Sequence, residues 1–153
     1  ELLTEQLAVI GIKLTVEVVE PDALFSSVIQ PRNYELLLTG LLLGIDSDPY
    51  PFWHSSQAKQ GGLNLSGYAN RNVDTLLEEA RVTIDQAVRA EKYRAFQDTV
   101  AEDIPAVFLY QSTYTYAIPT KIKDVLIERI ATPADRFANI SSWYIKTKKT
   151  LRR

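Results

Sequence analysis

Residues 34–53, YELLLTGLLLGIDSDPYPFW, decide the fold class. The first half of this stretch is almost entirely apolar, which is typical of a strand buried on both faces of a parallel sheet. The second half becomes polar and contains Pro49 and Pro51. We therefore predict a strand over residues 34–44 that runs into a long loop over residues 45–72. A loop of that length in a compact domain is usually functional.

The residues before this stretch complete a crossover unit. Apolar side chains at helical spacing predict a helix over residues 3–10, and Gly11 is suited to end it. Alternation of apolar and polar residues predicts a strand over residues 13–20, and Pro21 opens a short helix that extends to residue 29. Helix, strand, helix and strand in this order favour right-handed α/β packing.

Two amphipathic helices are predicted after the loop, with Asn72 and Asp85 as their N-caps. Their apolar faces are formed by Val73, Leu76, Leu77 and Ala80 and by Ala90, Tyr93, Phe96 and Val100. From Pro105 the pattern returns to extended segments, over residues 106–118, 121–130 and 141–147.

The composition excludes several classes of function. The 153 residues carry a formal net charge of -2, so no basic field attracts nucleic acid or an anionic membrane. No apolar run approaches the roughly 20 residues of a transmembrane helix. The absence of Cys excludes disulfides and Cys-ligated metals. The chain lacks Met and begins with a helical pattern, so we expect a piece of a longer protein whose targeting signal lies outside it.

Four stretches, in order and with matching gaps, carry a resemblance to a known family. They are LLTEQLAVIGIKLTVEVVE (2–20), YELLLTGLLLGIDSDPYPFW (34–53), LSGYANRNVDTLLEEAR (65–81) and EKYRAFQDTVAEDIPAVFLY (91–110). Together they resemble the family 5 extracellular solute-binding proteins, which include the oligopeptide-, dipeptide- and nickel-binding components of ABC importers.

The resemblance implies an α/β fold of the type II periplasmic-binding-protein class, of which this chain would be the C-terminal lobe, with a mixed sheet flanked by helices. It implies that residues 1–112 form the main part of the ligand-binding lobe. Residues 113–153 would be the final strands, which return toward a first lobe that is absent from this chain.

The resemblance also implies a transport function without chemistry and without a cofactor. The protein would capture a small solute, with a peptide as the leading candidate, outside the cytoplasm in the periplasm or, as a lipoprotein, at the outer face of the membrane. It would then deliver the solute to an ABC permease. Because affinity would come from both lobes, we expect this chain alone to bind weakly. Since the face that met the first lobe would be exposed, we also expect the isolated chain to self-associate.

Ligands of open α/β sheets bind beyond the carboxyl ends of the strands, so the end of the leucine-rich strand should face the ligand. The predicted ligand-binding residues are therefore Leu41, Leu43, Ile45, Asp46, Asp48 and Trp53. In the alternative interpretation the leucines are core residues and Trp53 anchors the loop.

One position departs from the pattern of the family. Members that bind peptides carry an Asp four residues before the loop proline, where it takes the amino group of the ligand. Ile45 occupies that position here, and an apolar side chain cannot pair with an ammonium group. Either Asp46 or Asp48 replaces it, or the ligand is not a peptide with a free amine.

The competing hypothesis is a hydrolase or metal-binding protein that uses Asp46, Asp48 and the single histidine, His54. The simpler interpretation is that Asp48 shapes a turn with Pro49 and that His54 makes local hydrogen bonds.

Overall fold

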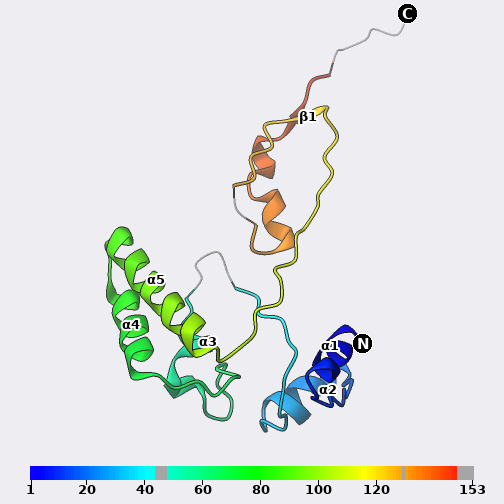
Figure 1. Ribbon diagram of the computed structural model, residues 1–153. Coiled ribbons are helices and arrows are strands. Elements are labelled where there is room, and N and C mark those ends of the chain that lie inside the picture. The colour runs from blue at the N-terminus through cyan, green and yellow to red at the C-terminus, as the bar shows by residue number, and fades with distance from the viewer. Residues whose placement is uncertain (44–47, 129, 148–153) are drawn as a thin grey trace, which may run out of the picture.

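The computed structural model describes residues 1–43, 48–128 and 130–147. Figure 1 shows three groups of helices and short strands, joined by extended segments. The predicted positions Ile45 and Asp46 lie outside the described residues. No helix in the described ranges is long and apolar enough to cross a membrane.

The first group consists of α1 (Leu2–Val9), α2 (Pro21–Ala23) and the π-helical turn η1 (Leu24–Ile29). Gly11, at φ +80°, ends α1 as predicted. Its N–H donates to the carbonyl of Ala8 at 3.0 Å, and the N–H of Ile12 donates to the carbonyl of Leu7 at 3.0 Å. This pair of bonds is the Schellman motif, which satisfies two of the carbonyls left free at a helix end.

The second group contains the core. Its elements are α3 (Tyr50–Trp53), the 3₁₀ turn η2 (Ser55–Gln57), α4 (Arg71–Val82) and α5 (Gln86–Asp103). Helices α4 and α5 pack side by side (Figure 1) and bury Val73, Leu77, Ala80, Phe96 and Val100. All five belong to the predicted apolar faces, so the 3.6-residue periodicity identified this core correctly.

The N-cap of α4 is Asn70, so the prediction of Asn72 is wrong by two residues. The side-chain Oδ1 of Asn70 accepts from the N–H groups of Asn72 at 2.9 Å and Val73 at 3.3 Å. Asn70 therefore satisfies the first free donors of the helix, which an asparagine inside its first turn cannot do. Asp85 caps α5 as predicted, by accepting from the N–H groups of Ala87 and Val88.

The strands predicted over residues 13–20, 34–44 and 106–118 are not hydrogen-bonded in the described part of the chain. Leu36, Leu38 and Leu42 are 72–75% exposed instead of buried on both faces. A strand exists only when a neighbour pairs with its backbone, and within the described residues these extended segments have no neighbouring strand. The pattern indicated which residues are suited to burial but could not supply the partner.

The third group contains the sheet of the described residues. Strand β1 (Ile122–Lys123) pairs antiparallel with β2 (Tyr144–Ile145), with Ile122 opposite Ile145. Both strands lie within segments predicted to be extended. The turns η3 (Pro133–Phe137) and η4 (Ile140–Ser142) lie between them.

We predict that Val73→Ala lowers the free energy of unfolding by about 2 kcal/mol, because Val73 is fully buried and its truncation leaves a cavity. The matched control is Val82→Ala at the end of the same helix, where the side chain is 79% exposed. That change should leave the free energy of unfolding within about 0.5 kcal/mol of the parent. Urea denaturation followed by circular dichroism measures both, and equal effects of the two substitutions would contradict this core.

Candidate functional site

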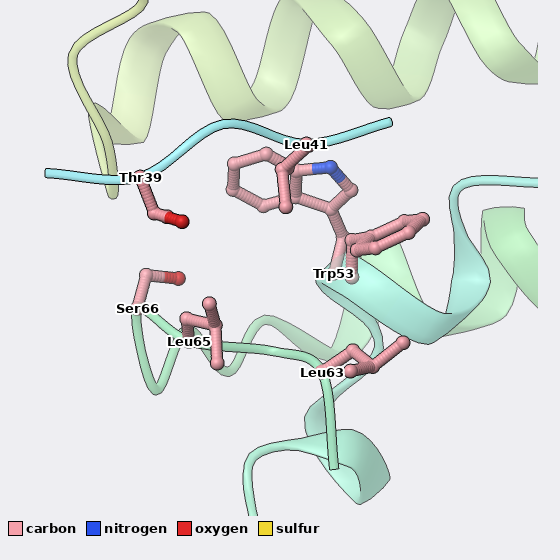
Figure 2. A pocket seen from close by; sticks show the side chains of 7 residues that line it. Thr39, Leu41, Trp53, Leu63, Leu65 and Ser66 are labelled. Atoms are coloured by element: carbon pink, nitrogen blue, oxygen red, sulfur yellow. The ribbon is translucent and has the colours of Figure 1, made fainter. Parts of the chain in front are cut away.

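An apolar pocket of about 110 Å³ opens between the end of the leucine-rich segment and the long loop. It is lined by Thr39, Leu41, Phe52, Trp53, Leu63, Leu65 and Ser66. Figure 2 shows Thr39 and Leu41 on one side, Leu65 and Ser66 facing them, and the indole of Trp53 closing one end. Three separate segments, residues 39–41, α3 and the turn 63–66, therefore contribute its walls.

Trp53 joins this pocket to the core. Its ring lies 6.3 Å from that of Phe96 on α5, 6.4 Å from that of Tyr68 and 5.8 Å from that of Phe108, measured between ring centroids. Such tilted and edge-on arrangements are favourable for aromatic rings. The geometry thus combines the two interpretations of Trp53, because the same indole anchors the loop and lines the pocket.

Asn64 holds the loop together from inside. It is fully buried, and its amide nitrogen donates to the carbonyls of Trp53, His54 and Tyr68 at 3.4, 3.2 and 2.8 Å. Its Oδ1 accepts from the hydroxyl of Ser66 and from the N–H of Tyr68, both at 3.2 Å. Sequence analysis missed this residue, because an asparagine in a glycine-rich loop has no periodic signal to mark it as buried.

Arg32 and Tyr34 tie the turn of the loop to the chain before the leucine-rich segment. The Nη2 of Arg32 donates to the carbonyls of Lys59 at 3.2 Å and Gly62 at 2.8 Å, and its Nη1 donates to the hydroxyl of Tyr34 at 3.1 Å. That hydroxyl donates in turn to the carbonyl of Leu65 at 2.7 Å. These residues were also missed, since the contacts span about 30 positions of sequence.

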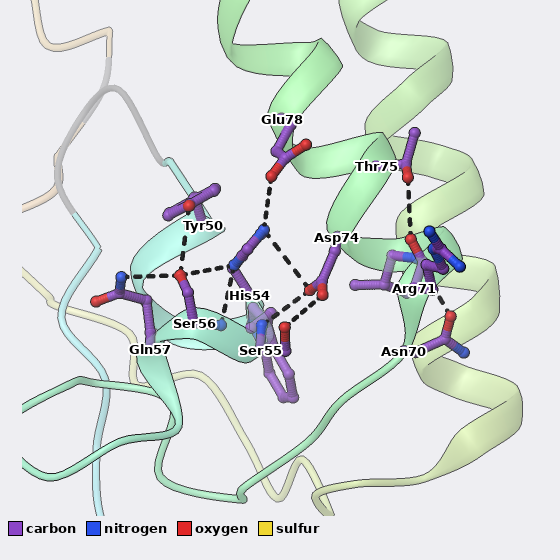
Figure 3. A network of polar contacts seen from close by, with 12 residues as sticks. Tyr50, His54, Ser55, Ser56, Gln57, Asn70, Arg71, Asp74, Thr75 and Glu78 are labelled. Carbon is purple, nitrogen blue, oxygen red and sulfur yellow. Dashed lines mark hydrogen bonds and ion pairs between the residues drawn. The ribbon is translucent and has the colours of Figure 1, made fainter.

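His54 is buried where α3 and η2 meet α4 (Figure 3). Its Nδ1 accepts from the N–H of Ser56 at 3.1 Å and lies 2.8 Å from the Ser56 hydroxyl. Its Nε2 lies 3.1 Å from Glu78 and 3.8 Å from Asp74. Asp74 also accepts from the N–H of Ser55 at 2.8 Å and from its hydroxyl. The imidazole therefore caps η2 and fastens it to α4, in agreement with the local hydrogen bonds predicted for His54.

Asp48 binds the first residue of α3 and a side chain of α4. Its Oδ1 accepts from the N–H of Tyr50 at 3.0 Å, and its Oδ2 lies 3.1 Å from the Nε of Arg81. The guanidinium of Arg81 lies over the ring of Tyr50, 4.3 Å from its centroid, and that ring stacks on His54 at 4.2 Å. Asp48 thus shapes a turn, as the simpler interpretation predicts.

The structure therefore separates the predicted ligand-binding residues. Leu41 and Trp53 meet in one pocket, whereas Leu43 is exposed and does not line it. Asp48 pairs with Arg81, and Ile45 and Asp46 lie outside the described residues.

The described residues, which do not include Asp46, give the hydrolase or metal hypothesis no supporting geometry. The contacts of His54 are to Glu78 and Asp74, while the carboxylate of Asp48 is bound to Arg81. Among residues 1–43, 48–128 and 130–147, no group of three or more His, Asp or Glu side chains is arranged to hold a metal ion.

Tyr68, Asn70 and Asp103 link the start of α4 to the end of α5. Asp103 accepts from the Tyr68 hydroxyl at 2.5 Å and from the Asn70 amide at 2.8 Å. Burial, reinforced by the bond to Asp103 and by its charge, raises the pKa of Tyr68 to about 12. The bonds from Tyr68 and Asn70 lower the pKa of Asp103 below 3.8.

We expect Asn64→Ala to open the loop locally, because it removes the hydrogen bonds to the carbonyls of Trp53, His54 and Tyr68 and from the N–H of Tyr68, at a cost of about 3 kcal/mol. Trypsin should then cleave after the exposed Lys59 about tenfold faster or more, as measured by mass spectrometry of the fragments. The matched control is Asn72→Ala, an exposed asparagine at the start of α4. A cleavage rate that is the same in both variants would show that Asn64 does not hold the loop.

The burial of Tyr68, together with its bond to Asp103, predicts a late tyrosine titration. One of the eight tyrosines should deprotonate near pH 12 in ultraviolet absorbance, and Asp103→Asn should move this step toward 10 because it removes the negative charge. Since the pKa of Tyr68 is raised on folding, its contribution to stability is present below pH 10 and is lost as the pH rises through about 12. The contribution of Asp103, whose pKa is lowered, is present above pH 3.8 and is lost as the pH falls further.

Two controls identify the residues in that titration. Tyr68→Phe should abolish the late step, and Asp98→Asn, an exposed acid on the same helix as Asp103, should leave it unchanged. Persistence of the late step in Tyr68→Phe would assign it to another tyrosine.

Comparison with known proteins places this geometry in context. No family model matches the chain. The chain is 30% identical over 145 residues to the oligopeptide-binding protein AppA of Bacillus subtilis (strain 168), which covers 94% of this chain and 26% of that protein. It is 38% identical over 80 residues to the probable D,D-dipeptide-binding periplasmic protein DdpA of Escherichia coli (strain K12), which covers 50% of this chain and 16% of that protein.

A solved structure of AppA in complex with a nonapeptide matches this chain with a TM-score of 0.67 at 29% identity, over 95% of this chain and 28% of that one. The chain thus spans about a quarter of the length of AppA. The structural match confirms the predicted type II periplasmic-binding-protein class, of which this chain is a part. In sequence and in fold the chain is homologous to the oligopeptide- and dipeptide-binding proteins of extracellular solute-binding protein family 5, as the order of its four motifs predicts.

Proposed function

We propose that this chain is part of the substrate-binding protein of an ABC importer, which captures a peptide outside the cytoplasm and delivers it to the permease. The observation that carries the proposal is the similarity over 94% of the chain to an oligopeptide-binding protein. The solved structure matched by this chain holds a nonapeptide. The proposed activity is the closure of two lobes on a ligand, which is a conformational change without chemistry. The protein would therefore not be an enzyme and would need no cofactor.

The proposed ligand wall is built around Leu41 and Trp53. Pockets that enclose a whole small ligand measure about 300–1,000 Å³, so a pocket of about 110 Å³ suits one side chain of a longer ligand. The remaining contacts would come from the first lobe and from Leu43, Ile45 and Asp46. Residues 1–112 would form the main part of the lobe. Residues 113–153 would be the final segment, which returns toward the first lobe. The antiparallel pair of β1 and β2 lies wholly within residues 113–153, in agreement with this division.

The contacts of Asp48 bear on which acid would take a ligand amine. Both of its carboxylate oxygens already have partners, in the Tyr50 N–H and in Arg81. We therefore propose that Asp48 positions α3 and that Asp46 is the candidate partner of an ammonium group. The name of DdpA states a periplasmic location, which supports an extracytoplasmic location for this protein. Self-association of the isolated chain stays a prediction.

The test of this proposal uses the full-length protein that contains this segment, with nonapeptides titrated in by calorimetry. Leu41→Ala should weaken binding about tenfold, because it removes apolar wall from the pocket. Leu42→Ala is the matched control, since the neighbouring leucine does not line the pocket. It should change the affinity less than threefold. Native mass spectrometry of the purified protein should also reveal bound peptides, and failure of all nonapeptides to bind, with no peptide retained, would refute the proposal.

A further inference from the structure

Arg32 occupies a backbone position that suits glycine better. It has φ +60°, in the left-handed region, and it ends η1. Its N–H donates to the carbonyl of Ile29 at 3.2 Å, and the N–H of Asn33 donates to the carbonyl of Val28 at 2.9 Å. This is the same pair of bonds that Gly11 and its neighbour make at the end of α1. A side chain at this position is unfavourable for the backbone, so its presence needs a compensating contact.

The side chain of Arg32 provides that contact at a distance. Its two terminal nitrogens bind the carbonyls of Lys59 and Gly62 and the hydroxyl of Tyr34. The turn it holds is tight, since a Cβ on Gly62 would lie 2.1 Å from the carbonyl oxygen of Gln57. The bound backbone therefore has little freedom to shift, and we call Arg32 and Tyr34 together the clamp.

The clamp connects opposite walls of the apolar pocket. On one side, the chain continues from Tyr34 directly into the segment that bears Thr39 and Leu41. On the other side, the Tyr34 hydroxyl binds the carbonyl of Leu65, which lines the facing wall. The distance between these walls is therefore set by hydrogen bonds that lie outside the pocket.

The lining indicates what the pocket would accept. Carbon surface from leucine, phenylalanine and tryptophan side chains forms most of it. Figure 2 shows the hydroxyls of Thr39 and Ser66 at the same end of the pocket, one on each wall. A cavity of about 150 Å³ accepts benzene, so a pocket of about 110 Å³ suits an aliphatic side chain. The hydroxyls are placed to meet the polar backbone from which such a side chain would extend.

We propose that Arg32 and Tyr34 are positioning residues that fix the width of this pocket and thereby restrict it to one aliphatic side chain of a bound peptide. The inference rests on the proposed function, since it assigns selectivity to the same ligand wall. It adds two residues that touch no ligand themselves but determine which side chain fits.

The test measures selectivity separately from stability. The full-length protein is titrated with a host nonapeptide in which each position in turn carries Ala or Leu. The parent should prefer Leu over Ala by about tenfold or more at one position, as expected when an apolar pocket is filled. In Tyr34→Phe, which removes one hydroxyl, and in Arg32→Gly, which keeps the backbone conformation, that preference should fall to about threefold or less. The matched control Tyr110→Phe changes an exposed tyrosine outside the pocket and should keep the preference of the parent.

Each outcome distinguishes the two proposals. If the parent binds no nonapeptide and retains no peptide on purification, the proposed function is wrong. If the parent binds but shows no preference at any position, or if both clamp variants keep its preference, the function stands and the clamp is wrong. A loss of thermal stability with an unchanged Leu/Ala ratio would make the clamp purely structural, and it would also overturn the inference.

Discussion

A long loop can pack against a protein only if its backbone polar groups find partners, and here Asn64 supplies many of them. Residues 54–70 contain little regular structure, so few of their carbonyls and N–H groups are paired by helix or strand. One buried amide binds three carbonyls, one hydroxyl and one N–H. Because buried polar groups without partners are costly, this single side chain lets Trp53 and Tyr68 reach the core. Trp53, held in this way, forms part of the wall of the pocket.

Side chains of helix α4 bind several residues of the loop and hold it against the core. Its apolar face forms the core with α5, while Asp74, Glu78 and Arg81 recur at helical spacing on a second face. These three side chains bind Ser55, His54 and Asp48, which follow each other in the reverse order along the chain. Exposed ion pairs contribute little individually. Asp74, Glu78 and Arg81 instead fix the position of the loop along the helix, because each of them binds a different point of the loop.

The parts of this structure that could be predicted from sequence are those determined by near neighbours. Helices α1, α4 and α5 and the buried residues of α4 and α5 follow from apolar periodicity, and the caps Gly11 and Asp85 follow from local chemistry. The leucine-rich segment shows the limit, because a strand depends on a partner that the pattern does not specify. The site shows the same limit. Leu41 and Trp53 could be predicted to line a pocket, but the Arg32 contacts join positions about 30 residues apart and leave no local signal.

The contacts of Asp48 also bear on whether this residue would shape the site or bind a ligand. A carboxylate that binds a ligand amine must turn an oxygen toward it, whereas the two oxygens of Asp48 are turned toward the Tyr50 N–H and Arg81. Helix α3 carries Phe52 and Trp53, so withdrawing Asp48 toward a ligand would loosen two walls of the pocket that the ligand must enter. Asp48 is therefore better suited to shaping the site than to binding in it. Under the proposed function, the apolar lining of the pocket favours selection by apolar fit over selection by charge.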